Sequence, residues 1–177
     1  MDTHSSAIHS VAQMHLAHVM TLLATVTAAS AICAGIAGGV YFAFSTMVMP
    51  ALRSAPANRA IAVMQRVNVN AVRPPFMLVF FGGAAAALAV LVTEISAGTD
   101  TPASTSRAVG AGLALAAFGI TVVRNVPLNN ALARVTVDAP DAAAQWNRFS
   151  RAWRVANHAR AAAAIAATIL LATPLES

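Results

Sequence analysis

The chain has 177 residues, of which 58% are hydrophobic and only 10% are charged. This composition is too apolar and too poor in charge for an ordinary soluble domain, so a membrane protein is the better interpretation. The net charge of +5 is the difference between eleven basic residues, all of them arginines, and six acidic residues. Because these arginines are split between two loops and accompany no RNA- or DNA-binding motif, we expect no nucleic-acid partner.

Four stretches lack Asp, Glu, Lys and Arg: residues 3–52, 74–93, 108–123 and 161–175. About 20 apolar residues cross a hydrocarbon core of roughly 30 Å, so the last two stretches need help from flanking residues. The sequence thus predicts one all-α domain: an integral membrane four-helix bundle with a cytoplasmic helical loop and an extended fourth helix. The spans are expected at approximately residues 18–49, 75–95, 108–125 and 159–174.

The first span is longer than a bilayer requires, so its helix must tilt, bend or project beyond the headgroups. Ala31, Gly35 and Gly39 repeat at four-residue spacing, which would let another helix approach closely. Glycines scattered in an alanine-rich span explain the pattern equally well. Residues 1–17 contain no Lys or Arg, so we expect no secretory signal and a first span that is retained.

The connection between the first two spans predicts a helix over residues 57–70. Its arginines share one stripe at 100° per residue, and Asn68 falls nearly opposite them, on the face that would meet protein. Pro74 and Pro75 suit the start of the second span, where their missing N–H groups would be free anyway. This arrangement brings Asn68 to the cytoplasmic mouth of the bundle.

The third span ends in the polar motif "NVPLNNALARV", residues 125–135. Thr121, Asn125 and Asn129 lie four residues apart, so a continuing helix would put them on one face. Pro127 lacks an N–H and can kink that helix. The motif is therefore either a capped or kinked helix end, or a set of polar groups that faces the bundle interior.

The segment "DAAAQWNRFSRAWRVANHARAAAAIAATILLA" predicts one long helix that enters the membrane near Arg160. Trp146, Trp153, Asn157 and Arg160 lie within about 60° of one another on the helical period, whereas His158 turns away. The stripe is thus separate from the other arginines of this segment.

Polar groups from three segments fall at one predicted membrane depth, near the cytoplasmic face. Such groups are costly inside a membrane unless they pair or line a cavity. The sequence therefore predicts an Asn/Trp/Arg pocket formed by Asn68, Asn125, Asn129, Trp153, Asn157 and Arg160.

The motifs "GVYFAFSTMVMPAL", "MQRVN" with "PPFM", "TVVRNVPLNNAL" and "RAWRVANHAR" resemble the anthrone oxygenase-like membrane proteins, formerly a domain of unknown function. The resemblance covers residues 35–172 and implies the fold and the membrane location. Some fungal relatives are linked to the oxidation of anthrones to anthraquinones. Ala156 departs from the family pattern, which has Trp there. The matching positions are Asn68, Thr121, Asn125, Pro127, Asn129, Trp146, Trp153, Asn157, His158 and Arg160.

The resemblance implies oxidation of an apolar aromatic substrate without a cofactor. Arg160 and the carboxamides, including that of Asn157, would donate to the oxyanion of an enolate in a low-dielectric site. His158 is the candidate base, because histidine is the side chain best suited to proton transfer, although the helical period turns it roughly 120° from Trp146. The alternatives are a structural or headgroup role for His158 and a snorkelling anchor for Arg160.

Other chemistry has little support in the sequence. There is no Gly-rich phosphate motif and no catalytic carboxylate pair, and Cys33 is alone. His15 and His18 have i, i+3 spacing but no clear third ligand, so we expect neither a metal nor a cofactor. The alternative function is a non-catalytic bundle that binds a lipid or quinone or packs against a partner protein. Expected partners are the membrane and a small apolar or aromatic molecule or lipid; a homo-oligomer remains open.

The distribution of arginines predicts the topology in the inner (plasma) membrane. Ten lie in the connections after spans one and three, and only Arg107 lies elsewhere. Because basic residues accumulate in cytoplasmic loops, both chain termini should be outside. Reporter fusions after Thr101 and at Ser177 should both give external signals, and a cytoplasmic signal from either would contradict this orientation.

Overall fold

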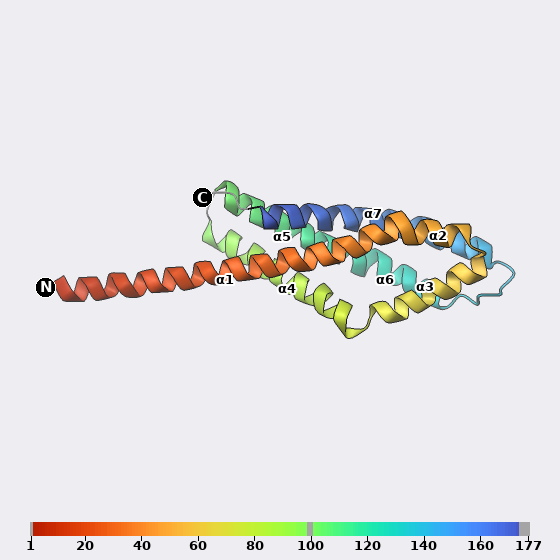
Figure 1. Ribbon diagram of the computed structural model, residues 1–177, viewed down its shortest axis with the longest axis horizontal. Helices are drawn as coiled ribbons and strands as arrows, with labels where there is room; N and C mark the ends of the chain where they lie inside the picture. The colour runs from red at the N-terminus through yellow and green to blue at the C-terminus, as the bar shows by residue number, and fades with distance from the viewer. Residues whose placement is uncertain (1, 99–100, 174–177) are drawn as a thin grey trace.

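The computed structural model describes residues 2–98 and 101–173, and every regular element in that part of the chain is helical (Figure 1). The all-α prediction is therefore confirmed. The elements in chain order are α1 (Asp2–Ala43), the π-helical turn η1 (Phe44–Val48), α2 (Met49–Ser54), α3 (Ala57–Ala71), α4 (Pro74–Ala97), α5 (Pro102–Ile120), the π-helical turn η2 (Thr121–Asn125), α6 (Val126–Ala133) and α7 (Ala142–Ala172).

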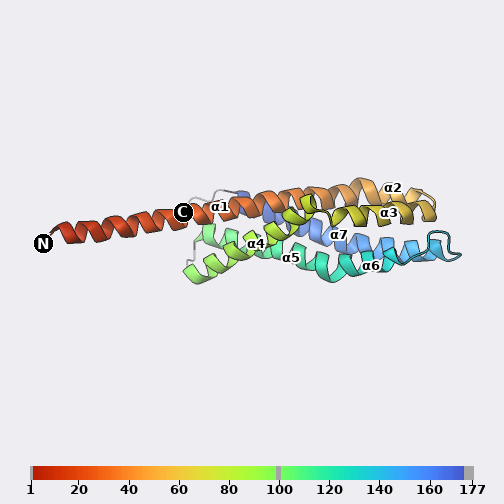
Figure 2. The same cartoon turned by 90° about the horizontal axis from the view of Figure 1, so that it is seen from below.

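Four helical stretches are long and apolar enough to cross a membrane: His9–Ser54, Pro74–Ala97, Pro102–Ala133 and Ala142–Ala172. Their main helices form a ring, in which α1 and α5 each pack against both α4 and α7. Figure 2 shows these helices from the side, running along the long axis of the molecule. The four-helix bundle is thus confirmed. Figure 1 also shows that the N-terminal part of α1 projects beyond the other helices.

The outer surface of the bundle is apolar. Leu78, Ile95, Val123 and Ile169 are each at least 60% exposed. A surface of this kind is unfavourable in water and natural against lipid tails. The burial pattern therefore agrees with a membrane protein, as the composition indicates.

A second packing layer covers one end of the bundle. It consists of α2, α3, α6 and the first half of α7, whose buried residues include Met49, Ile61, Leu132 and Trp146. Gln65 of α3 donates to the backbone oxygens of Leu132 and Val135, at 2.9 and 3.0 Å. This layer, which contains the helix predicted for residues 57–70, fixes α3 against the end of α6.

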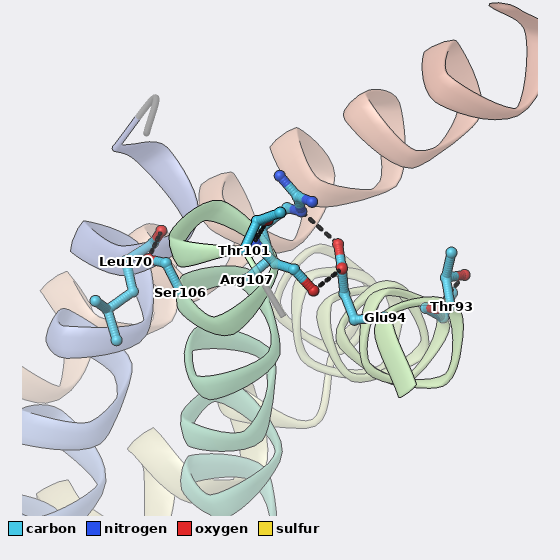
Figure 3. Close-up of polar contacts among 8 residues, drawn as sticks. Thr93, Glu94, Thr101, Ser106, Arg107 and Leu170 are labelled. Atoms are coloured by element: carbon cyan, nitrogen blue, oxygen red, sulfur yellow. Dashed lines mark hydrogen bonds and ion pairs between the residues drawn. The ribbon is translucent and has the colours of Figure 1, made fainter. Parts of the chain in front are cut away.

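An ion pair between a buried Glu94 and a partly exposed Arg107 holds α4 and α5 together at the opposite end (Figure 3). Glu94 is 5% exposed and accepts hydrogen bonds from the Arg107 guanidinium and from Ser104 Oγ, the latter at 2.7 Å. Ser106 Oγ donates to the carbonyl oxygen of Leu170 at 3.1 Å, which ties α5 to α7. Buried charge is stable here because it is paired and hydrogen-bonded.

Small residues set the distance between α1 and α7, but the glycines in contact only partly match the predicted four-residue repeat of Ala31, Gly35 and Gly39. A Cβ on Gly35 or Gly38 would touch α7, at 3.4 Å from Thr168 and 3.3 Å from Ala164, whereas one on Gly39 would meet nothing. The reason is that a four-residue repeat drifts around a helix of 3.6 residues per turn. Close approach between α1 and α7 therefore depends on Gly35 and Gly38.

The tightest approach involves Gly83, which gives a prediction about stability. A Cβ on Gly83 would lie 2.7 Å from the Cβ of Cys33. Gly83→Ala should force α4 away from α1 and lower the free energy of unfolding by about 1–3 kcal/mol. The measurement is titration with SDS in mixed micelles, followed by circular dichroism. Gly82→Ala is the matched control, because nothing lies within 4 Å of its added Cβ; equal effects would contradict the packing argument.

Candidate functional site

Two π-helical turns interrupt the helices around the predicted pocket. Pro50 follows η1 within two residues and Pro127 follows η2 within two residues. A proline removes a backbone hydrogen bond and crowds the carbonyl one turn earlier, so a wider turn before it relieves the conflict. The kink anticipated at Pro127 thus takes the form of a π-helical turn.

Arg160 of α7 lies at the centre of the polar groups and is only 8% exposed. Its Nε and Nη2 atoms both donate to Asn157 Oδ1, at 3.0 and 2.8 Å. Its Nη1 atom donates to Thr121 Oγ1 at 3.1 Å. The guanidinium therefore points into the bundle, as the helical period predicts, and joins α7 to η2.

Asn157 is fully buried and orients the arginine. Its Nδ2 donates to the backbone oxygen of Tyr41 at 2.8 Å and to Ser45 Oγ at 2.7 Å. With both amide hydrogens directed at α1 and η1, its oxygen is free to accept from Arg160. One carboxamide thus connects α1 and η1 to the guanidinium.

The positive charge of Arg160 is offset by neutral groups rather than by an acid. Its Cζ atom lies 4.0 Å from the centroid of the Tyr41 ring and 5.3 Å from that of Trp153, within the range of cation–π attraction. None of the carboxylates among the described side chains pairs with it, and each bonds elsewhere. Those carboxylates belong to Glu94, Asp138 and Asp141.

Trp153 links the arginine to the asparagines of η2 and α6. Its indole Nε1 donates to Asn129 Oδ1 at 2.9 Å, and its backbone oxygen accepts from Asn125 Nδ2 at 3.5 Å. Asn125 Oδ1 and Asn68 Nδ2 are buried without a hydrogen-bond partner in the described chain. Unpaired buried amides of this kind are costly unless something else satisfies them.

A cavity of about 620 Å³ lies beside these groups. Arg160, Thr121, Asn129 and Trp153 line one side of it, and Asn68 lies at its α3 side. Apart from Tyr41 and Asn70, the remaining wall is apolar and includes the rings of Phe44, Phe76, Phe80 and Phe81. The volume and lining are typical of a small-molecule site with a few polar groups that orient the ligand.

The structure brings together most of the predicted site residues and separates others. Trp146 packs against Phe149 in the second layer, with ring centroids 5.5 Å apart, and does not line the cavity. His158 is exposed on the other side of α7, so it has no access to the cavity. Ala156, which departs from the family pattern, lines a separate surface groove and not the cavity.

Three residues of the first membrane helix escaped the sequence reasoning. Tyr41 covers the guanidinium, Ser45 accepts from Asn157, and Phe44 packs on Trp153 with centroids 5.6 Å apart. A usable signal was present, because Tyr41 is the only tyrosine in the chain and Ser45 lies one helical turn after it. For metal binding, no group of three His, Cys, Asp or Glu side chains occurs among the residues described.

Fold and site together define a membrane protein whose four-helix bundle encloses an apolar cavity with one buried arginine. The family model described as anthrone oxygenase matches residues 76–170, more than half of the chain, and the chain belongs to this family. The matched segment begins at the start of α4 and contains Thr121, Asn157 and Arg160. Comparisons with curated proteins and with solved structures gave no match.

The role of Asn157 as the link between α1 and Arg160 gives a prediction. Asn157→Leu keeps similar volume but leaves Arg160, Ser45 and the Tyr41 carbonyl without their shared partner. We expect the free energy of unfolding to fall by at least about 3 kcal/mol, because one of the stranded groups is charged. SDS titration measures it, with Asn147→Leu on the exposed face of the same helix as control. Similar stability of the two variants would remove Asn157 from this role.

Proposed function

We propose that the protein oxidises an enolisable, planar aromatic ketone of the anthrone class inside the membrane, using molecular oxygen and no cofactor. The observation that carries the proposal is a buried arginine without a carboxylate partner, facing an aromatic-lined cavity. The alternative is a non-catalytic bundle that holds a lipid or quinone in the same cavity.

Arg160 retains donors for a ligand. A guanidinium has five N–H groups, and hydrogen bonds to Asn157 and Thr121 engage three of them. The two remaining N–H groups belong to an uncompensated cation at the cavity wall. An enolate oxygen is the complementary partner, since charge-assisted hydrogen bonds are strong where water is excluded.

The proposed reaction balances without a redox cofactor. The methylene carbon of the anthrone loses a proton to water at the cytoplasmic, Asn68 side of the cavity, and the electron pair delocalises onto the ketone oxygen beside Arg160. Oxygen then forms a C–O bond at that carbon, giving a peroxide. Loss of the second C–H proton with cleavage of the O–O bond yields the quinone carbonyl and water. The carbon loses four electrons and O₂ gains four, so anthrone and O₂ give anthraquinone and water.

In this proposal the side chains orient the substrate and stabilise charge. Asn68 Nδ2, which lacks a partner and lines the cavity, is a candidate contact for an oxygen substituent. The Phe76, Phe80 and Phe81 rings would stack on a planar substrate. His158 has no part in it, because it lies on the outer face of α7.

The proposed orientation follows the arginine distribution, with the cavity near the cytoplasmic face and both termini outside. The cavity mouth carries exposed apolar residues, among them Val72 and Val126 at 67% and 41% exposure. An apolar substrate dissolved in the bilayer would therefore enter from the lipid without crossing water.

Replacement of Arg160 tests the proposal. Purified protein in lipid nanodiscs should consume oxygen with anthrone and form anthraquinone in equal amounts, above the protein-free rate. Arg160→Gln should lower kcat about 100-fold or more, because it removes the cation that stabilises the enolate. Arg160→Lys should also be impaired, since an ammonium cannot keep the hydrogen bonds of the planar fork.

Two matched controls accompany these variants. Arg148→Lys and His158→Ala change exposed positions on the same helix and should leave turnover unchanged. Wild-type turnover by Arg160→Lys and Arg160→Gln would contradict the proposed role. Saturable quenching of tryptophan fluorescence by anthrone, without oxygen uptake, would favour the non-catalytic alternative.

A further inference from the structure

A second hollow lies on the outside of α7, away from the cavity. It has a volume of about 770 Å³ and runs between α7 and the junction of α5 with η2. Arg124, Arg148 and Arg151 line it. Arg151 is nine residues before Arg160, about 180° away around the helix, so this groove and the cavity are independent sites.

The three arginines are exposed and have no acid near them. The groove lining contains no Asp or Glu, and none of the three guanidiniums pairs with a carboxylate among the described residues. Asn147 adds an amide beside them. Three like charges held around one hollow repel one another, so the arrangement favours an anion that several of them contact at once.

The other part of the groove is apolar and shallow. Ala152, Ala156 and Ala159 form its floor, and Ile120 and Val155 flank them. The hollow exists because the floor side chains are small. Val155 is 68% exposed, so this strip is uncovered in the chain itself.

The groove crosses the predicted boundary of the membrane. Arg124 directly follows the charge-free residues 108–123, whereas Ala159 lies just before the charge-free residues 161–175. By this prediction the basic part lies at headgroup depth, and the apolar strip runs along α7 toward the point near Arg160 where the helix enters the hydrocarbon. Along α7 the charged part of the groove is followed by its apolar strip, just as the charged headgroup of a phospholipid is followed by its acyl chains.

We propose that this groove binds an anionic phospholipid, with the phosphate held by Arg124, Arg148 and Arg151 and one acyl chain lying along the alanine floor. Basic pockets between membrane helices bind such headgroups, and each arginine near an anionic surface strengthens binding about fivefold. A free phosphate would leave the apolar strip uncovered. A zwitterionic lipid would leave the three positive charges uncompensated.

The test is competitive lipid retention by the full-length protein. Delipidated protein in detergent is incubated with equal amounts of phosphatidylglycerol and phosphatidylcholine of identical acyl chains, and bound lipid is counted by native mass spectrometry. Wild type should retain phosphatidylglycerol at least about tenfold over phosphatidylcholine. Each single Arg→Gln change at 124, 148 or 151 should weaken retention about fivefold. Glycerol phosphate, which lacks the acyl chain, should not be retained.

Charge-matched variants separate the groove from the overall charge of the protein. The triple variant of Arg53→Gln, Arg59→Gln and Arg66→Gln removes the same charge from exposed positions elsewhere and should retain the lipid preference. Ala152→Trp keeps every arginine but fills the floor, and should reduce retention at least tenfold. The proposal would be overturned if both sets of arginine variants lost lipid equally or if the wild type showed no lipid preference. It would also be overturned if Ala152→Trp bound lipid normally or if glycerol phosphate were retained.

Discussion

The interior of this bundle is organised around one uncompensated positive charge. A cation in an apolar environment is costly unless polar groups surround it, and Arg160 obtains these from one amide oxygen, one hydroxyl and two aromatic rings. Asn157 Oδ1, Thr121 Oγ1 and the Tyr41 ring come from α7, η2 and α1, so three helical segments must keep their relative depth for the charge to be tolerated. Because none of these groups is an anion, the net charge at the cavity remains available to a ligand.

The backbone irregularities lie where this polar network is made. Ser45 belongs to η1 and Thr121 to η2, and each of these π-helical turns precedes a proline. Inside a membrane, irregular backbone is tolerated only where protein or a cavity covers it. The prolines thus explain why α1 and α5 widen at this depth, and the widened turns bring a hydroxyl from each toward α7.

The sequence alone predicted the bundle well, because four charge-free stretches and Pro74–Pro75 mark the helices directly. It also placed Trp153, Asn157 and Arg160 on one face, since helical period determines angle. The helical period does not determine the depth of a residue along the helix axis. Trp146 shares the angle of these three residues but precedes Arg160 by 14 positions. It therefore lies about 21 Å from Arg160, in the second packing layer. Tyr41 was missed because α1 is apolar on all sides, so its pattern does not indicate which side faces α7.

The two faces of α7 suit ligands of different shape: a flat ring system on the cavity side, and an acyl chain with a charged head on the outer side. Toward the cavity, Phe80 stacks with Phe118 of α5 at 4.5 Å between centroids and meets Phe81 edge to face at 5.2 Å, which makes an aromatic wall in the same cavity as Arg160. A flat ring system with one anionic oxygen can contact the wall and the guanidinium together, whereas a flexible acyl chain gains nothing from the charge. On the outer face the floor is alanine and the charges lie at one end. That arrangement matches a chain with a charged head, so under the two proposals the same helix would distinguish its ligands by where the arginine lies relative to the apolar surface.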